Sequence, residues 1–315
     1  MSYKFNSYVN QDDLKQCSKE IDYLISVGYG DLNFDAIYKW AVILNTIEEI
    51  GLNSKKCNCI EVGGGLSPIP LILSNKHIVT DVDIQHNATW FPIKKVDKIY
   101  NKAKLEFNKD NIKYIKSKDK LVGQQQAKHR FGRYIGMAAD VKIINKYNPY
   151  CDYFNSIEDN TVDFICDTSS RIHLLNDKVT ILNEMYRVLK PGGYIIMVSD
   201  VSHPNSTEFK DPLNGFKDIY HRRRIVELYN ESGFTTWLGE DWELDSFFSD
   251  NKNFHYPMDH FQRGHKVRYK NTQQACDDKC SKSPTAHLLC EYGDDDRGGM
   301  DIIRARFLFR KPTQL

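Results

Sequence analysis

The sequence lacks any run of about 18 apolar residues, the length that a membrane-spanning helix needs, so we expect no such helix. Its first residues, Met1–Asn6, contain no apolar segment of the kind found in secretory signal peptides. Without such a signal, eight cysteines in 315 residues are more consistent with reduced thiols or metal ligands than with a disulfide framework. These absences predict a cytoplasmic protein that has no membrane partner.

A strong net charge is also missing, since 43 Lys and Arg residues balance 42 Asp and Glu residues. This balance argues against a protein that coats nucleic acid, although a local patch can still bind it. Residues 94–133 are such a patch, with thirteen basic and four acidic residues. This stretch is either a solvated helix and loop or a basic flap that meets an anionic substrate.

The chain is organised around the segment Cys59–Pro68, which reads as a short buried strand, a turn of three glycines and the start of a helix. Glycine at the end of a strand lets a ligand approach the backbone closely, and the first N–H groups of the helix point at that ligand. A dinucleotide-binding turn requires Gly or Ala three residues after its second glycine. Pro68 occupies this position, so the turn predicts a nucleotide cofactor other than NAD.

Apolar runs and helical periodicity alternate along most of the chain. We expect strands at 57–62, 77–84, 134–140, 161–167, 194–198, 235–238 and 302–309, and helices at 11–27, 34–50, 69–73, 179–189 and 219–232. This alternation predicts an α/β fold with a doubly wound, mostly parallel sheet. We expect residues 1–53 to form a helical cap on a main domain at 54–315. Two insertions are expected in that domain, the basic one at 94–133 and an aromatic, Cys- and His-containing one at 245–300.

Three segments resemble the class I S-adenosylmethionine-dependent methyltransferases, especially the type-11 group. Glu61–Gly65 is similar to the acidic-x-Gly-x-Gly turn of this family, and Val79–Ile84 is similar to its second strand, which ends in an acid. The most specific segment is Glu158–Ile165 followed by Leu182–Gly193, which ends in Arg-Val-Leu-Lys-Pro-Gly-Gly before an apolar strand. The resemblance covers roughly 57–238 and the final strand. It implies a Rossmann-like methyltransferase fold whose last strand lies antiparallel beside the fifth.

The resemblance also implies that S-adenosylmethionine is the cofactor. Gly63, Gly64 and Gly65 would bring the backbone close to its methionine moiety and ribose. Glu61 would organise the turn and help to hold the cofactor's amino group.

At the end of the second strand, the resemblance implies that Asp83 accepts hydrogen bonds from both ribose hydroxyls, with Ile84 beside it. Asp81 is the rival acid, on the same face but deeper in the strand. For the adenine amino group two acids stay open. Asp140, followed by Val141, comes directly after the expected third strand, whereas Asp152 has the more usual distance from the fourth strand.

Beyond the fourth strand, Asp167 stands where the family lines the methyl-transfer site. The sulfonium is already activated, so most of the catalysis can come from aligning the acceptor with the methyl carbon. A hydroxyl or amine acceptor also requires a base. The candidates are His203, after the fifth strand, and His173, after the fourth, for which a purely structural role is the alternative.

Near the C-terminus, four soft ligands fall within fifteen residues: Cys276, Cys280, His287 and Cys290. Four such ligands suit tetrahedral zinc, but a Cys-x2-Cys knuckle is absent. The alternative is a set of reduced cysteines in a surface insertion. Aromatic residues between 242 and 261 would wall a substrate pocket or form the insertion's own core.

These observations predict methyl transfer to a small molecule or a sugar, at oxygen. An Asn-Pro-Pro-Tyr-like tetrapeptide is missing after the fourth strand, which argues against N-methylation of a base. Three alternatives stay open: RNA methylation that uses the basic stretch, aminopropyl transfer on the same fold, and a non-catalytic scaffold for a partner enzyme.

Overall fold

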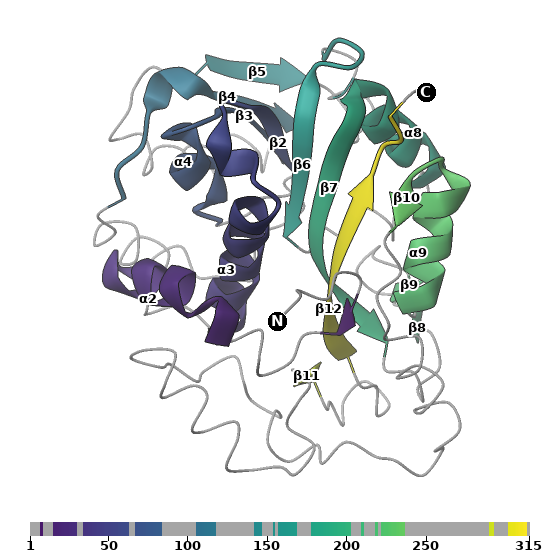
Figure 1. Cartoon of the computed structure of the whole chain (residues 1–315), viewed down its shortest axis with the longest axis horizontal. Coiled ribbons are helices and arrows are strands. Elements are labelled where there is room, and N and C mark those ends of the chain that lie inside the picture. The colour runs from purple at the N-terminus through teal and green to yellow at the C-terminus, as the bar shows by residue number, and fades with distance from the viewer. Residues whose placement is uncertain are drawn as a thin grey trace.

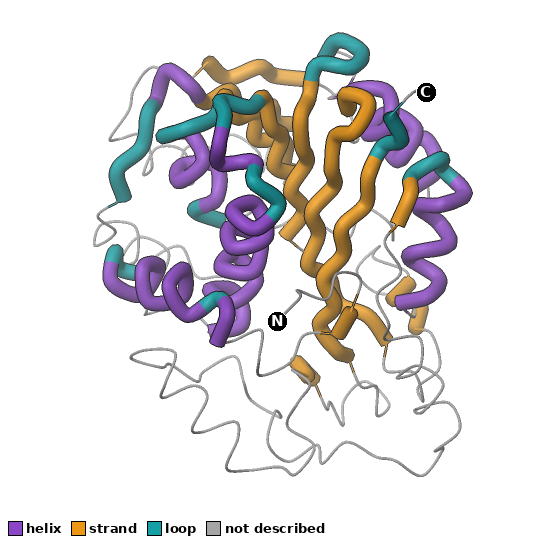
Figure 2. Tube along the Cα trace, viewed as in Figure 1, coloured by secondary structure: helices purple, strands orange, loops and turns teal. Residues whose placement is uncertain are grey.

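The computed structural model describes residues 7–8, 15–29, 34–62, 67–83, 105–117, 142–146, 154, 157–168, 178–202, 209–210, 218–219, 222–236, 290–292 and 302–313. The centre of the molecule is a ten-stranded mixed sheet with helices packed on both faces (Figures 1 and 2). The sheet and its two helical layers make the α/β architecture that the alternating pattern predicts.

Six parallel strands form most of the sheet, in the order β7-β6-β2-β3-β4-β5. They are β2 (Asn58–Val62), β3 (Ile78–Asp83), β4 (Ile112–Ser117), β5 (Lys142–Lys146), β6 (Val162–Thr168) and β7 (Leu189–Ser202). The chain builds the sheet outward from β2 to β5 and then returns to add β6 on the other side of β2. The strand order therefore reverses between β2 and β6.

The last long strand, β12 (Ile302–Arg310), lies antiparallel beside β7, with Ile302 opposite Ser202 and Arg310 opposite Tyr194. Three short strands pair antiparallel with β12: β1 (Ser7–Tyr8), β10 (Thr235–Thr236) and β11 (Cys290–Tyr292). The strands β8 (Phe209–Lys210) and β9 (Asp218–Ile219) form a separate ribbon. The last strand lies antiparallel beside β7, the strand expected as the fifth, and this confirms the expected arrangement. The parallel strand β5 was not among the expected ones, so β7 is the sixth parallel strand in chain order.

The helices pack on the two faces of the sheet through two separate clusters of buried apolar side chains, which we call, in the order given below, the first and the second cluster. On one face lie α2 (Ser18–Ser26), α3 (Phe34–Glu49) and α4 (Ile69–Ser74), with the 3-10 turns η2 (Leu52–Ser54) and η4 (Lys109–Asn111) nearby. The helices α8 (Lys178–Val188) and α9 (Arg222–Glu231) cover the other face. Side chains alternate along each strand, so Cys59 joins the first cluster and Ile60 the second.

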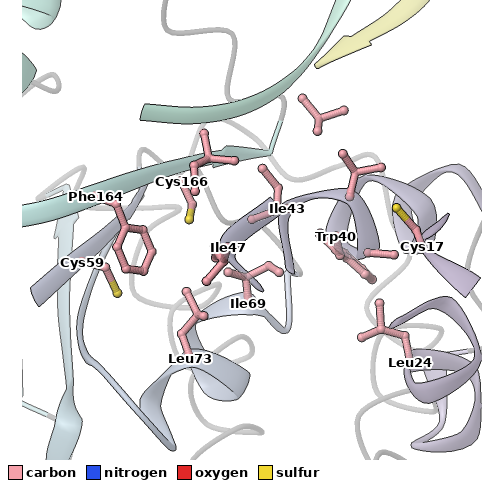
Figure 3. Packing of buried hydrophobic residues seen from close by; sticks show 14 of the residues in the cluster. Cys17, Leu24, Trp40, Ile43, Ile47, Cys59, Ile69, Leu73, Phe164 and Cys166 are labelled. Atoms are coloured by element: carbon pink, nitrogen blue, oxygen red, sulfur yellow. The ribbon is translucent and has the colours of Figure 1, made fainter. Parts of the chain in front are cut away.

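The first cluster ties the N-terminal helices directly to the sheet. Figure 3 shows Ile43 and Ile47 of α3 close to Ile69 of α4, with Phe164 and Cys166 of β6 beside them. Ile47 and Ile69 are fully buried, and α3 contacts β6 and β7. The helical region before residue 54 therefore shares one core with the sheet.

The Arg-Val-Leu-Lys-Pro-Gly-Gly run joins α8 to β7. Here α8 ends at Val188, and β7 pairs irregularly with β6 before a regular register begins at Tyr194. Gly192 has a φ of +80°. A Cβ on Gly193 would lie 2.9 Å from the backbone oxygens of Asp163 and Lys190, so this position requires glycine.

Arg187 fastens the end of α8 to the segment before β6. Its Nη1 donates to the carbonyl oxygen of Ile157 at 2.9 Å, and its Nη2 donates to that of Phe154 at 2.7 Å. The guanidinium also pairs with Glu184 at 2.7 Å and with Asp159. A planar fork with five donors can make all these contacts at once, which explains why arginine stands here.

Most expected elements are found, but the third strand was placed wrongly. We expected it at 134–140, which lies outside the described residues, whereas the strand that pairs with β3 is β4, at Ile112–Ser117. This strand lies within the stretch taken as a basic insertion, and its sequence, Ile-Lys-Tyr-Ile-Lys-Ser, contains three apolar residues and two lysines. Ile112 is buried in the first cluster. A second departure is β1, a strand within a region expected to be helical.

The fifth strand is also longer than expected, because β7 runs from Leu189 to Ser202 and continues past the end of β6 at Thr168. No helix within the described ranges is long and apolar enough to cross a membrane.

Candidate active site

The carboxyl ends of the neighbouring strands β2, β3 and β6 lie side by side, and the strand order reverses between β2 and β6. We call this border of the sheet the carboxyl edge. These strands end at Val62, Asp83 and Thr168. In open α/β sheets this is the place where the connecting loops diverge and leave a crevice for a ligand. The glycine turn at 63–65 directly follows β2, so the sequence places it at this edge.

Glu61 is the second-last residue of β2, next to the carboxyl edge, and is fully buried. In the register of the sheet it is opposite Asp81 of β3 and Cys166 of β6. It shares a face with Cys59, two residues earlier, so it belongs to the side covered by α2, α3 and α4. The hydroxyl of Thr168 donates to its Oε1 at 3.4 Å. A carboxylate buried at this edge is suited to a cationic or hydrogen-bond-donating ligand.

Thr168 was expected only as part of the segment 167–170 that follows the fourth strand, and its contact with Glu61 was not predicted. The period of two along β6 places it on the same face as Phe164 and Cys166, which lie in the first cluster. This periodicity is the signal that could have identified it. The structure places the hydroxyl of Thr168 within hydrogen-bonding distance of Glu61.

Asp167, the neighbouring acid, is fully buried but alternates to the other face of the sheet. There, burial raises the pKa of the Tyr229 hydroxyl well above its usual value, and the charge of Asp167 adds to that effect. The proposed contribution of Asp167 to the methyl-transfer site stays a prediction.

The two acidic residues of β3 lie at different distances from the carboxyl end of the strand. Asp81 is 6% exposed and opposite Glu61 in the register. Asp83 is the last residue of the strand and is opposite Lys116 of β4. The resemblance implies a ribose contact for the acid at the tip of the strand, and assignment of that contact to Asp83 stays a prediction.

Two buried thiols lie beneath the site. Burial raises the pKa of Cys59 and Cys166 well above the usual value, and the charge of Glu61 adds to this shift in both residues. These thiols therefore stay protonated and act as small apolar residues. Cys17, Cys57, Cys59 and Cys166 form no disulfide bond.

Several predicted site residues lie outside the described ranges: Gly63, Gly64, Gly65, Ile84, Asp140, Val141, Asp152, His173, His203, Cys276, Cys280 and His287. Cys290 is the first residue of β11, opposite Ile303. Within the ranges that the structure describes, no group of three or more His, Cys, Asp or Glu residues could hold a metal ion. The zinc hypothesis therefore stays a prediction.

The strand β5 lies, along the chain, between the two candidates for the adenine contact, Asp140 and Asp152. It starts at Lys142, directly after Asp140 and Val141, and runs parallel to β4. Its carboxyl end, at Lys146, precedes Asp152 in the chain. Neither acid is a described residue, so the adenine contact stays a prediction for which both Asp140 and Asp152 are open.

A family model described as a methyltransferase domain matches residues 145–197, which include β6, α8 and the first part of β7. The chain matches no curated protein sequence.

Solved structures similar to this chain include methyltransferases from three organisms. The first is a S-adenosylmethionine-dependent methyltransferase from Aquifex aeolicus, with 17% identity over 70% of this chain and 90% of that one, and a TM-score of 0.36. The second, 1,6-didemethyltoxoflavin-N1-methyltransferase from Burkholderia thailandensis, has 10% identity over 89% and 79%, and a TM-score of 0.42. The third, phosphoethanolamine N-methyltransferase 2 from Haemonchus contortus, has 14% identity over 87% and 53%, and a TM-score of 0.41.

The strand order, with β12 antiparallel beside β7, defines a Rossmann-like methyltransferase fold. The match over 145–197 falls on the segment that carries the Arg-Val-Leu-Lys-Pro-Gly-Gly run. These two observations confirm the resemblance to the class I methyltransferases, and methyl transfer from S-adenosylmethionine is the general chemistry that they support. The buried carboxylate of Glu61 fits the ammonium group of that cofactor, because it offers an acceptor at the edge where the glycine turn follows.

Proposed function

We propose that this protein transfers a methyl group from S-adenosylmethionine to an oxygen atom of a small molecule or a sugar. The observation that carries the proposal is the position of Glu61, buried at the reversal point of a methyltransferase-type sheet and hydrogen-bonded by Thr168. Asp83, at the tip of β3, supplies the second acidic position of the same edge.

The proposal assigns one role to each of three residues. Glu61 holds the ammonium group of the cofactor, and Thr168 fixes the orientation of that carboxylate. Asp83 accepts hydrogen bonds from the ribose hydroxyls. The bound cofactor supplies an activated methyl group, so the chain mainly aligns the acceptor with it and excludes water, effects that together can lower a barrier by about 7–11 kcal/mol in well-oriented systems.

Oxygen is the proposed acceptor atom because of the residues that follow β6. Asp167-Thr168-Ser169-Ser170 stands where the enzymes that methylate base nitrogens have Asn-Pro-Pro-Tyr. A hydroxyl acceptor must lose its proton, and His203 directly follows β7, which ends at Ser202. We propose His203 as the base, with His173 as the second candidate.

Isothermal titration calorimetry with S-adenosylmethionine, S-adenosylhomocysteine and NAD tests the cofactor. We expect the first two to bind and NAD not to bind. Asp83→Ala should weaken binding by about 10–100-fold, which corresponds to the loss of hydrogen bonds to a charged group. Asp110→Ala, which removes an exposed acid on η4, is the matched control and should leave binding unchanged. Binding of NAD alone would overturn the cofactor assignment, and unchanged binding to Asp83→Ala would overturn the ribose assignment.

A mass-spectrometric assay tests the acceptor. The full chain is incubated with S-adenosylmethionine and separate pools of phenols, sugars and RNA, and methylated products are identified. A methylated phenol or sugar supports the proposal. Formation of no S-adenosylhomocysteine with any pool, despite cofactor binding, favours a non-catalytic scaffold.

RNA is the second candidate acceptor because the strands at one side of the sheet carry many lysines. In the register of β4 and β5, Lys113 is opposite Lys142, and Ser117 is opposite Lys146. If RNA is the substrate, its binding should weaken steeply as salt increases, because bound counterions are released when lysines meet phosphates. RNA binding that does not depend on salt would argue against this candidate.

A further inference from the structure

A cavity of about 300 Å³ opens between α2, α3 and α4, remote from the carboxyl edge of the sheet. His77, which lines it, directly precedes β3, so the cavity lies at the amino end of that strand. Glu61 and Asp83 lie toward the opposite, carboxyl ends of their strands. The volume is at the lower limit of known ligand pockets, enough for a small molecule with one or two rings.

Much of the cavity wall is apolar. Leu44 and Ile47 line it from α3, and Ile72 and Leu73 line it from α4. Ile47 and Leu73 belong to the first cluster and approach each other from the two helices (Figure 3). These side chains favour a hydrocarbon or aromatic body over a polar one.

Four of the polar side chains that line the cavity are exposed to solvent. Lys19 Nζ lies 3.2 Å and 3.3 Å from the two carboxylate oxygens of Glu48, and the two side chains are 76% and 55% exposed. Lys76 and Tyr23 are exposed as well. Because solvent hydrates and screens these groups, which include charges of both signs, they do not select a ligand by its charge.

The histidine and the two amides of the lining have partners within the chain. His77 Nδ1 accepts the backbone N–H of Cys57 at 3.2 Å, so the ring proton resides on Nε2, which lies 3.2 Å from Asn53 Oδ1. Burial lowers the pKa of His77, so the ring is neutral near pH 7. The side chain of Asn75 is exposed, and its Nδ2 donates to the carbonyl oxygen of Glu106 at 2.7 Å.

Glu20 differs from these residues, because it is buried and keeps an oxygen without a donor. It lines the cavity from α2 and is only 8% exposed. Its Oε2 is buried and has no hydrogen-bond partner among the described residues. Of the side-chain polar atoms in this lining, it alone is both buried and without a partner within the described ranges. A buried acceptor in this state is costly, so a ligand that brings a donor is favoured over one that does not.

We propose that this cavity binds a small neutral aromatic molecule that carries a ring N–H group, with its rings between α3 and α4 and its N–H donated to Glu20. The apolar walls select the rings and penalise a charge, and the buried acceptor selects the donor. Rotation of the terminal carboxyl group, a soft torsion in glutamate, brings Oε2 toward the ligand.

The ligand class does not depend on whether Glu20 is ionised. A carboxylate accepts hydrogen bonds through both oxygens, and a neutral carboxyl group still accepts through its carbonyl oxygen. The site is separate from the proposed methyl-transfer site, and its existence does not depend on that function.

Titration calorimetry with indole tests the site, with 1-methylindole as the matched ligand that lacks the N–H group. We expect the full chain to bind one indole, and to bind 1-methylindole about 3–10-fold less tightly, as for the loss of one hydrogen bond. Glu20→Met keeps the length of the side chain but removes the acceptor, so the two compounds should then bind with equal affinity. Glu49→Met is the control, since Glu49 is an exposed glutamate of α3 that does not line the cavity, and it should retain the preference for indole.

A second variant, Leu44→Trp, fills the cavity and should abolish the binding of both compounds, with thermal unfolding as the check on its fold. Saturating S-adenosylhomocysteine should leave the binding of indole unchanged. The proposal is overturned by the absence of saturable binding, by equal affinities of the wild type for the two compounds, by a preference that survives in Glu20→Met, or by competition with S-adenosylhomocysteine. Failure of S-adenosylhomocysteine to bind would count against the proposed function alone.

Discussion

Lys190 Nζ lies 2.9 Å from Asp163 Oδ2, and the same oxygen accepts the backbone N–H of Asn58 at 2.9 Å. The side chain of Asp163 is 11% exposed. One carboxylate thus joins the amino ends of β2, β6 and β7, three neighbouring strands of the sheet. Lys190, the lysine of the Arg-Val-Leu-Lys-Pro-Gly-Gly run, therefore stabilises the sheet at the end opposite to the one where the cofactor is proposed to bind.

Asp163→Ala should lower the free energy of unfolding by about 2–3 kcal/mol, because it removes hydrogen bonds to a charged group and leaves a partly buried lysine without its partner. Urea unfolding followed by circular dichroism measures this loss. Asp110→Ala should change the free energy by less than about 0.5 kcal/mol, since that acid is exposed. Equal effects of the two substitutions would show that the junction contributes nothing.

Gly193→Ala should destabilise the fold by at least about 2 kcal/mol, because the new Cβ meets two backbone oxygens that cannot move without disturbing β6 and β7. Gly51→Ala is the comparison. Gly51 has a φ of +75° but nothing within 4 Å of the added atom, so only about 1 kcal/mol of backbone strain is expected. Thermal or urea unfolding ranks the two variants, and the reverse ranking would refute the steric argument.

Lys311→Met tests how the end of β12 is attached to α8. Lys311 Nζ donates to the carbonyl oxygens of Tyr186 and Leu189 and to Asn160 Oδ1, at 2.7–2.8 Å. Methionine keeps the length of the side chain but leaves these acceptors without the donor, so we expect a loss of about 1–3 kcal/mol in the free energy of unfolding. Lys56→Met, at an exposed lysine, serves as the control. A loss no larger than that of the control would mean that water replaces the ammonium group without cost.

His77 predicts a pH dependence of stability. Its pKa is lowered in the folded state, so below the usual value of 6.5 the unfolded chain binds the proton more readily. The contribution of a neutral His77 is fully present above pH 6.5 and is lost as the pH falls from 6.5 through its lowered pKa. The difference in unfolding free energy between the wild type and His77→Gln should therefore shrink between pH 7 and pH 5. A difference that stays constant over this range would show that His77 does not titrate as proposed.

Thr168→Val tests the positioning of Glu61 and rests on the proposed function. Valine has the same shape but no hydroxyl, so the carboxylate loses its 3.4 Å donor. We expect the affinity for S-adenosylmethionine to fall by about 3–10-fold, as for one hydrogen bond, with little change in thermal stability. The control is Thr161→Val, at the other end of the same segment, where the hydroxyl donates to the Glu158 carbonyl oxygen. If both variants bind S-adenosylmethionine equally, Thr168 has no positioning role.

The sequence predicted the strands that are apolar on both faces and the helices with a clear buried stripe. Phe164 and Ile165 show why, since adjacent residues of β6 are buried on opposite faces and the run is continuously apolar. Ile37, Ala41 and Ile47 likewise follow the helical period and are buried. The glycine requirement at 193 could also be anticipated from the motif.

The strand β4 could not be predicted in the same way, because it lies near the side of the sheet. Its six residues include two lysines, so a count of basic residues over the forty residues 94–133 does not reveal the strand. The role of Thr168 was hidden for a different reason. Its contact with Glu61 joins residues 107 positions apart, and only the register of β2 with β6 brings them together.

The dependence of the sheet on β12 has a consequence for biosynthesis. Ser7 and Tyr8 pair with Arg306 and Ala305, and β7 is bounded along its length by residues 302–310. On the ribosome, an early segment must therefore wait for nearly three hundred further residues before it finds its partner, and β7 stays an open edge until then. Completion of the sheet thus comes late in synthesis, and a nascent chain that stalls before residue 302 would expose an edge that pairs readily with other chains.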